Sequence, residues 1–201
     1  MAKGKGQKKG GNNEREKAKQ ISRWWTEGER DDVFWRDNSG ARATSRAKTG
    51  KSTAAGYGDI TLSDPCGEAL LRICTIELKR GYQELDMMAL LDSKAEKTKI
   101  FLNFWRQVSR DSSLAEKNGW GKFPVLITHR DRKRPLITLD KKLFASIREF
   151  SGDYPNSRII IENSEINAVV MVFEEWLEWC NPKTFTALYA KCSKKKVRRK
   201  W

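Results

Sequence analysis

The sequence predicts a mixed α/β fold in which one small central sheet is flanked by helices. Short runs rich in β-branched residues alternate with longer segments whose apolar residues recur at helical spacing. Hydrophobic residues make up 38% of the 201 positions, and eight Trp and eight Phe bury large areas each, so the chain can form a core. No stretch is long and apolar enough for a membrane span.

The first half of the chain predicts one helix followed by three strands. Ala18, Ile21, Trp24 and Trp25 share one face of a helix over 14–25. The three predicted strands cover 32–36, 57–62 and 71–79. The turn SDPCGE separates the last two strands, so we expect them to pair as a hairpin.

The second half predicts alternating helices and strands. A capping box of Ser93 and Glu96 marks the start of a long helix. The predicted elements are helices over 83–91 and 94–110, strands over 123–128 and 136–139, a helix over 141–150, a strand over 158–161, a helix over 165–180 and a short helix from Pro182. The predicted order is therefore α-β-β-β-α-β-β-α-β-α, with helical additions at the C-terminus.

Most of the net charge of +14 lies at the two ends of the chain. We expect 1–13 and 191–201 to be disordered basic tails around a single domain over 14–190, because they are too polar to form a core. Such tails favour contacts with a polyphosphate backbone, and solubility or anionic membranes are the alternatives. A third basic segment, rich in Ser, Thr, Ala and Gly, predicts a phosphate-binding loop that carries Arg36, Arg42, Arg46, Lys48 and Lys51.

Several classes of site are excluded by composition. The single histidine, His129, rules out zinc fingers of the two-Cys two-His type and His-rich metal sites, and no nucleophile motif accompanies it. The segment ending in Lys51 lacks P-loop spacing, so we expect no nucleotide cofactor. Four cysteines without a C-x-x-C pair, and no secretory signal, favour a cytoplasmic protein.

Two acids and a lysine form the strongest candidate site. Glu77 and Lys79 point to the same face of their strand, because side chains alternate with period two. Pairing with the preceding strand would bring Asp59 beside Glu77. A divalent cation would relieve the repulsion between the carboxylates, and oxygen ligands favour Mg²⁺, with Mn²⁺ able to substitute. The alternative is a solvated Glu-x-Lys ion pair with Asp59 as a turn residue.

These motifs resemble the PD-(D/E)XK nuclease superfamily, and within it the archaeal-type and phage-encoded Holliday-junction resolvases. Asp59 and Glu77-Leu78-Lys79 match its motif on the second and third strands of a restriction-endonuclease-like αβββαβ core. Three further features match the resolvases: Glu14-Arg15 opens the first helix, Arg36 ends the first strand, and Ser39-Gly40 begins the loop.

The resemblance implies a role for each matching residue. Asp59 and Glu77 would bind the metal with the Leu78 carbonyl, and Lys79 would act on the water and the transition state. Glu14, or Glu16 if the register differs, would be a further carboxylate near the metal, on the first helix. Ser39 would contact the scissile strand. Two departures are the long basic loop and Gly58, which stands where the family favours proline.

We therefore expect a Mg²⁺-dependent endonuclease that cuts branched DNA, above all four-way junctions, without a membrane partner. Two symmetric cuts require two active sites, so we expect a homodimer, with the Trp-rich segment 165–180 as a candidate dimer face. The expected DNA contacts come from Arg36, Ser39, Arg42, Arg46, Lys48, Lys51 and Arg80. A nuclease for linear duplex or single strands and a non-catalytic nucleic-acid-binding protein are the alternatives.

Overall fold

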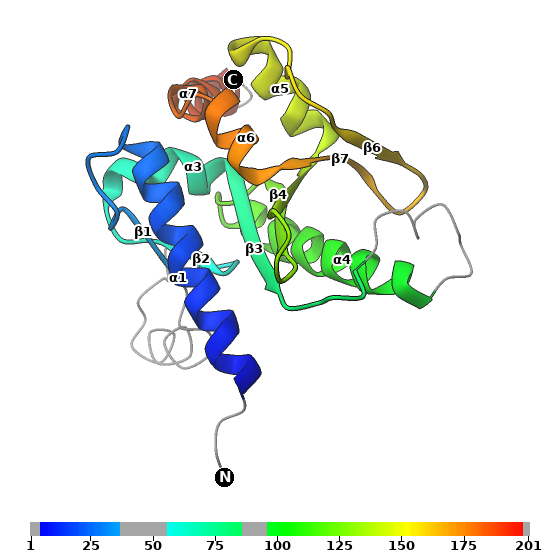
Figure 1. The fold of residues 1–201 in the computed structure, drawn as a ribbon. Coiled ribbons are helices and arrows are strands. Elements are labelled where there is room, and N and C mark those ends of the chain that lie inside the picture. Colours follow the sequence, from blue (N-terminus) through cyan, green and yellow to red (C-terminus); the bar gives the residue numbers. More distant parts are fainter. Residues whose placement is uncertain (1–4, 37–55, 86–95, 199–201) are drawn as a thin grey trace.

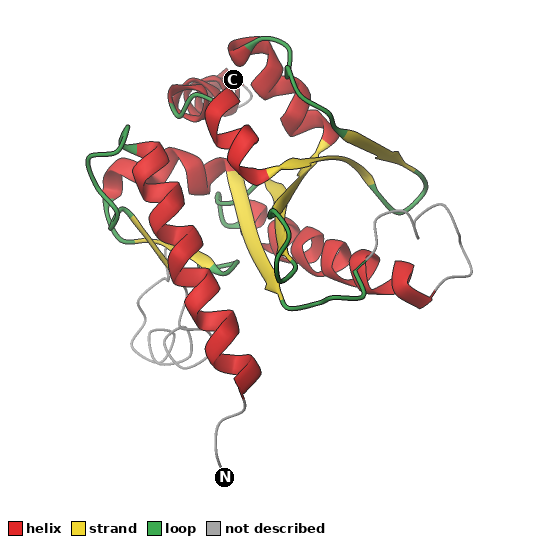
Figure 2. Cartoon of the chain, viewed as in Figure 1, coloured by secondary structure: helices red, strands yellow, loops and turns green. Residues whose placement is uncertain are grey.

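The fold has three layers, a five-stranded sheet with helices on both faces (Figures 1 and 2). The computed structural model describes residues 5–36, 56–85 and 96–198. The predicted mixed α/β class, with one central sheet flanked by helices, is confirmed. None of the helices in the described ranges is long and apolar enough to cross a membrane.

The central sheet has the strand order β3-β4-β5-β7-β6, so β3 lies at one edge and β6 at the other. Its strands are β3 (Cys74–Arg80), β4 (Phe123–His129), β5 (Leu136–Asp140), β6 (Ile159–Glu162) and β7 (Asn167–Val172). The β3–β4 pair is parallel, whereas the other pairs are antiparallel. One edge of β3 is therefore not covered by a neighbouring strand of this sheet.

The predicted hairpin between 57–62 and 71–79 is wrong. Strand β2 (Ile60–Leu62) pairs instead with β1 (Phe34–Arg36), and the two form a small antiparallel sheet of their own. A 3-10 turn (Pro65–Gly67) lies within the predicted turn, and helix α3 (Glu68–Ile73) takes the start of the predicted third strand. The helix forms there because its apolar residues are buried together and Glu68 pairs with Arg72 one turn later, at 2.9 Å.

Helix α4 (Glu96–Lys117) covers one face of the sheet, and Phe101, Trp105 and Val108 pack there with Leu126 and Val170. The larger core lies on the opposite face, and α3 contributes to it together with four further helices of the described residues. These are α1 (Lys5–Trp25), α5 (Lys141–Ser151), α6 (Phe173–Trp179) and α7 (Lys183–Arg198).

Several helices extend beyond their predicted limits, among them α4, which runs to Lys117 instead of ending at residue 110. Helix α1 begins at Lys5 instead of Glu14, and α7 continues to Arg198, so parts of both predicted tails are helical. Residues 83–85 form a turn instead of the start of a helix, and the rest of the predicted helix over 83–91 lies outside the described residues.

The predicted helix over 165–180 is also wrong, because its first half is strand β7. The run from Ala168 to Val172 is continuously apolar, as expected for a strand buried on both faces. The second half, α6, turns Trp176 into the core, where it is 4% exposed and lies 5.1 Å from the Trp24 ring. Trp176 is thus part of the core of the chain itself.

Strand β3 places its side chains on two different faces. Ile76 and Leu78 enter the core on the α1 side. Glu77 and Lys79 therefore face α4, as the period of two predicts. One face of β3 therefore packs in the core, and the other carries the Glu77 carboxylate and the Lys79 amine.

Candidate active site

Asp59 lies against the open edge of β3. Its N–H donates to the Ile76 carbonyl at 2.9 Å, and its carboxylate oxygen Oδ2 accepts the N–H of Leu78 at 2.8 Å. The N–H and C=O of one strand residue point to the same side, so the Leu78 carbonyl also faces this edge. The structure brings Asp59 to β3 as expected, through a loop segment and not through a hairpin.

Gly58 permits this close approach. A Cβ atom at this position would lie 2.4 Å from the Ile76 carbonyl oxygen, and 3.1 Å from the carbonyl carbon. Both neighbours are backbone atoms of β3, which cannot move aside without disturbing the strand. The departure from proline at this position therefore has a steric reason.

Glu77 is buried and held by two donors. It is 4% exposed, and its Oε1 accepts from Lys79 Nζ at 2.6 Å and from Gln107 Nε2 at 2.7 Å. Lys79 Nζ also lies 5.3 Å from the centre of the Phe104 ring. Gln107 and Phe104 are three residues apart on α4, so they share the helix face that meets β3.

Gln107 is a site residue that reading the sequence missed. The prediction of a helix over 94–110 rests on its apolar stripe, and Gln107 is not part of that stripe. A polar residue at i+3 from Phe104, on the buried face of a helix that follows the Glu-x-Lys strand, was the available clue.

Burial and the neighbouring acids raise the pKa of Asp59 to about 7. Burial is the largest cause, followed by the charge of Glu77, and Glu14 adds to it, while the Leu78 N–H and Lys79 act in the opposite direction. Burial by itself would lower the pKa of Lys79, but its hydrogen bond to Glu77 and the charges of Glu77 and Asp59 together raise it. Lys79 is therefore a cation at neutral pH.

Glu14 approaches the site from α1, on the opposite side of β3 from α4. Its Oε2 lies 3.6 Å from Arg36 Nη1, which joins the two residues that matched on the first helix and the first strand. The Arg36 guanidinium lies against Gly11, where a Cβ would be 2.4 Å from Nη1. Glu16 is exposed, and its charge acts to raise the pKa of Lys17 and of His129. The charge of Glu14 instead raises the pKa of Asp59, so Glu14 is the first-helix acid near the site.

Arg80 and His129 lie on the other face of the sheet from Glu77, next to each other in the β3–β4 register. Arg80 Nε is 3.8 Å from the Asp131 carboxylate. His129 Nδ1 lies 3.1 Å from the side-chain oxygen of the buried Asn13 and so links β4 to α1. Burial, together with Lys17 and Arg80, lowers the pKa of His129 and favours a neutral ring.

Five of the predicted site residues lie in the basic loop, outside the described residues. They are Ser39, Arg42, Arg46, Lys48 and Lys51.

The donor set at the edge of β3 fits a hard divalent cation. Within the described ranges no three His, Cys, Asp or Glu side chains gather closely enough to hold a metal by themselves. Asp59 and Glu77 each use one carboxylate oxygen in the contacts above, and the Leu78 carbonyl faces the same edge. The negative charge that raises the pKa of Asp59 is the charge that a cation would neutralise.

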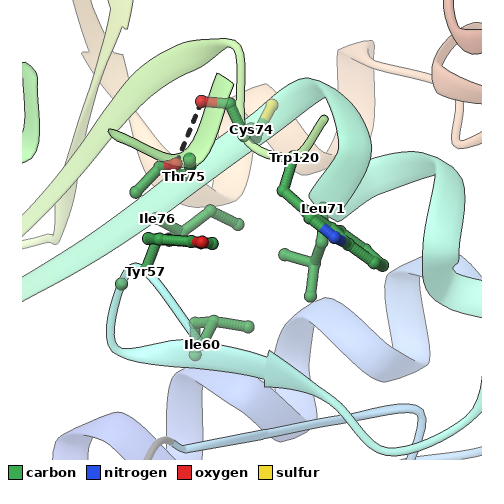
Figure 3. Close-up of a pocket in the computed structure, with 10 residues that line it drawn as sticks. Tyr57, Ile60, Leu71, Cys74, Thr75, Ile76 and Trp120 are labelled. Carbon is green, nitrogen blue, oxygen red and sulfur yellow. Dashed lines mark hydrogen bonds between the residues drawn. The ribbon is translucent and has the colours of Figure 1, made fainter. Parts of the chain in front are cut away.

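A small cavity lies beside this edge, and Gly58 is one of the residues that line it. Its volume is about 10 Å³, and Tyr57, Cys74, Ile76 and Trp120 are among the residues around it (Figure 3). This volume holds about one water molecule, so the cavity does not accommodate a nucleotide. Burial raises the pKa of the Cys74 thiol well above its usual range, which makes it a poor nucleophile.

Comparison with known proteins identifies a family over most of the chain. The model of the family described as "Phage putative PDDEXK endonuclease" matches residues 5–187. That stretch contains α1, the open edge of β3 and the complete central sheet. No curated protein and no solved structure matches the chain.

The first prediction concerns stability against pH in the metal-free protein. The folded-state pKa of Asp59, about 7, is above its ordinary value of 3.8, so the native state keeps this proton longer than the unfolded state does. Stability should therefore fall as pH rises from about 4 through 7, by up to about 4 kcal/mol. Asp59→Asn keeps an acceptor for the Leu78 N–H and should remove most of this fall.

Urea unfolding with EDTA at pH 4.5 to 8.5 measures the effect. Asp153→Asn, at a carboxylate whose side chain is 89% exposed, is the matched control and should follow the wild-type profile. Parallel pH profiles for wild type and Asp59→Asn would contradict the prediction.

Proposed function

The chain belongs to the phage putative PDDEXK endonuclease family, and from that premise we propose that it is a Mg²⁺-dependent nuclease that cuts branched DNA, above all four-way junctions, as a homodimer. Nucleases of the PD-(D/E)XK type generally use a divalent metal. The observation that carries the proposal is the meeting of Asp59, Glu77 and Lys79 at the open edge of β3.

Each of the site residues would have a separate role in hydrolysing a phosphodiester. Asp59, Glu77 and the Leu78 carbonyl would hold the metal, which when bound would supply positive charge against the phosphate oxygens and make a water more acidic. Lys79 is held in place by Glu77 at 2.6 Å and is protonated, so it offers a fixed cation and a hydrogen-bond donor to the developing negative charge.

The choice of branched DNA is supported by a second pair of residues. Glu14 and Arg36 are two of the residues on which the proposed resemblance to junction resolvases rests, and their side chains lie 3.6 Å apart. Arg36 could contact the DNA backbone while Glu14 adds negative charge near the metal. Basic residues at both ends and in the loop after Arg36 favour recognition of backbone shape over base sequence.

The outer edge of the sheet supports a dimer. Strand β6 pairs with β7 on one side, and Ile159 and Ile160 are 44% and 51% exposed. Antiparallel pairing of two β6 strands around Ile160 would place the exposed Arg158 of one copy opposite the exposed Glu162 of the other. Such a two-fold axis is perpendicular to the sheet, so both active sites would face the same side.

The second prediction tests the chemistry and the substrate. Lys79→Ala should lower cleavage of a labelled four-way junction by about 10²–10³-fold, since a donor to the transition state is lost, and Asp59→Ala should abolish it. Lys183→Ala, at an 81% exposed side chain, is the control and should cut as wild type does. EDTA should stop cleavage by the wild type.

Four-way junction, linear duplex and single strand are compared side by side. Equal metal-dependent cutting of all three substrates would contradict the junction specificity and support a general nuclease. Binding without any cleavage would contradict the nuclease itself, and active Asp59→Ala or Lys79→Ala variants would contradict the assigned site.

The third prediction concerns Gln107, which holds Glu77 from α4. Gln107→Leu should lower the rate of junction cleavage by about 10–100-fold, because residues that orient a metal ligand have effects of that size. Raising the Mg²⁺ concentration should restore part of the rate, whereas it should not rescue Lys79→Ala. Wild-type cleavage by Gln107→Leu at low Mg²⁺ would show that this hydrogen bond has no part in the reaction.

The fourth prediction tests the dimer by charge exchange. Arg158→Glu should weaken association by at least about tenfold, because it places like charges opposite each other. The double variant R158E/E162R should restore it, whereas Arg148→Glu, on α5, should have no effect. Sedimentation velocity over a range of protein concentrations measures the result. A monomeric wild type, or a double variant as weak as the single one, would rule out pairing through β6.

A further inference from the structure

Tyr82 is an exposed aromatic residue just beyond the strand that carries Glu77 and Lys79. Strand β3 ends at Arg80, and Gly81, with φ of 89°, turns the chain. Gly81 N–H donates to the His129 carbonyl at 3.1 Å, and Leu85 N–H donates to the Tyr82 carbonyl at 3.1 Å. Tyr82 is 44% exposed while Leu85 is buried at 1%, so an anchored backbone presents an exposed ring.

The Tyr82 ring is held beside Lys79. It meets the Phe104 ring edge-on, with centres 4.6 Å apart and planes at 66°. Lys79 Nζ lies 5.3 Å from the centre of that same Phe104 ring, so a single aromatic ring links Tyr82 to the lysine. An edge-on contact fixes the orientation of a ring and leaves its faces available to other groups.

We propose that Tyr82 is a stacking platform for an unpaired nucleobase next to the scissile phosphate. The inference rests on the proposed function, because it takes Lys79 as the group that receives the phosphate. A nucleotide whose phosphate contacts Lys79 has its base within reach of a neighbouring ring, and base stacking on an exposed aromatic side chain favours binding.

This placement narrows the substrate class. A base inside a regular duplex already stacks on both of its neighbours, so only a displaced or unpaired base can use the Tyr82 ring. Tyr82 therefore selects DNA whose cut strand opens beside the cleaved bond, as at a branch point, a flap or a single-stranded segment. Tyr82 should not increase the affinity of the protein for fully paired linear duplex.

Binding and base stacking are measured in EDTA, without cleavage, on full-length protein. The probes are a four-way junction with 2-aminopurine at its crossover, and a fully paired duplex with the same base. Tyr82→Ala should weaken junction binding by about 5–150-fold, the range that corresponds to one base stacked on an aromatic side chain. It should also remove the fluorescence quenching of the crossover base and leave duplex binding unchanged.

Three further variants separate stacking from other roles. Tyr82→Phe and Tyr82→Trp keep an aromatic ring and should bind the junction within about twofold of wild type, since stacking needs the ring and not the hydroxyl. Phe150→Ala removes a ring that is 47% exposed on α5 and should have no effect. Tyr82→Phe also gives a folded reference if Tyr82→Ala unfolds.

Each contrary result overturns the proposal. A Tyr82→Phe variant as weak as Tyr82→Ala would assign a hydroxyl contact with phosphate. Equal losses on junction and duplex, unchanged quenching in a folded Tyr82→Ala variant, or a wild type that binds neither probe would each exclude base stacking. Failure of the nuclease is recognised separately, as binding and quenching without metal-dependent cleavage by the wild type.

Discussion

The amide of Leu78 points away from the central sheet, on the side of β3 that no strand of that sheet covers, and the Asp59 carboxylate accepts its hydrogen at 2.8 Å. A backbone donor at an open edge requires an acceptor, and here a side chain fills that need. The contact brings Asp59 next to Glu77 and leaves the Leu78 carbonyl on the same edge. It also requires Gly58, because a Cβ there would collide with β3 at 2.4 Å. The placement of Asp59 beside Glu77 thus follows from one backbone N–H that no strand of the central sheet pairs.

Bringing two carboxylates together in a buried place costs free energy, which the structure offsets from both faces of the sheet. Lys79 and Gln107 donate to Glu77 on the α4 side. One backbone N–H, that of Leu78, partly stabilises the negative charge of Asp59. Burial and the charge of Glu77 outweigh it, because the pKa of Asp59 is raised to about 7. Glu14 adds negative charge from the α1 side, where Arg36 offsets it at 3.6 Å. A site with excess negative charge and hard oxygen donors is suited to a divalent cation, and the protonated Lys79 remains available to a phosphate.

The chemistry was easier to predict from the sequence than the path of the chain. Glu77 and Lys79 follow from the period of two along one strand, and this rule is local. The partner of 57–62 was misassigned because pairing depends on distant contacts, and β1 took the position expected for β3. In segment 165–180, the spacing of Ile166, Val169 and Phe173 predicts a helix, whereas the run of apolar residues between them suits a strand buried on both faces. Gln107 joins the candidate site through its hydrogen bond to Glu77, a contact between residues far apart in the sequence.

The central claim is that Asp59 and Glu77 together hold one divalent ion at the open edge of β3. Titration of the full-length protein with Mn²⁺, followed by electron paramagnetic resonance of the free ion, tests it without any DNA or activity. The account predicts one site in the wild type, weakened by about tenfold or more in both Asp59→Asn and Glu77→Gln, and unchanged in Asp153→Asn. Variants of Asp59 and Glu77 that bind Mn²⁺ as tightly as the wild type would contradict it.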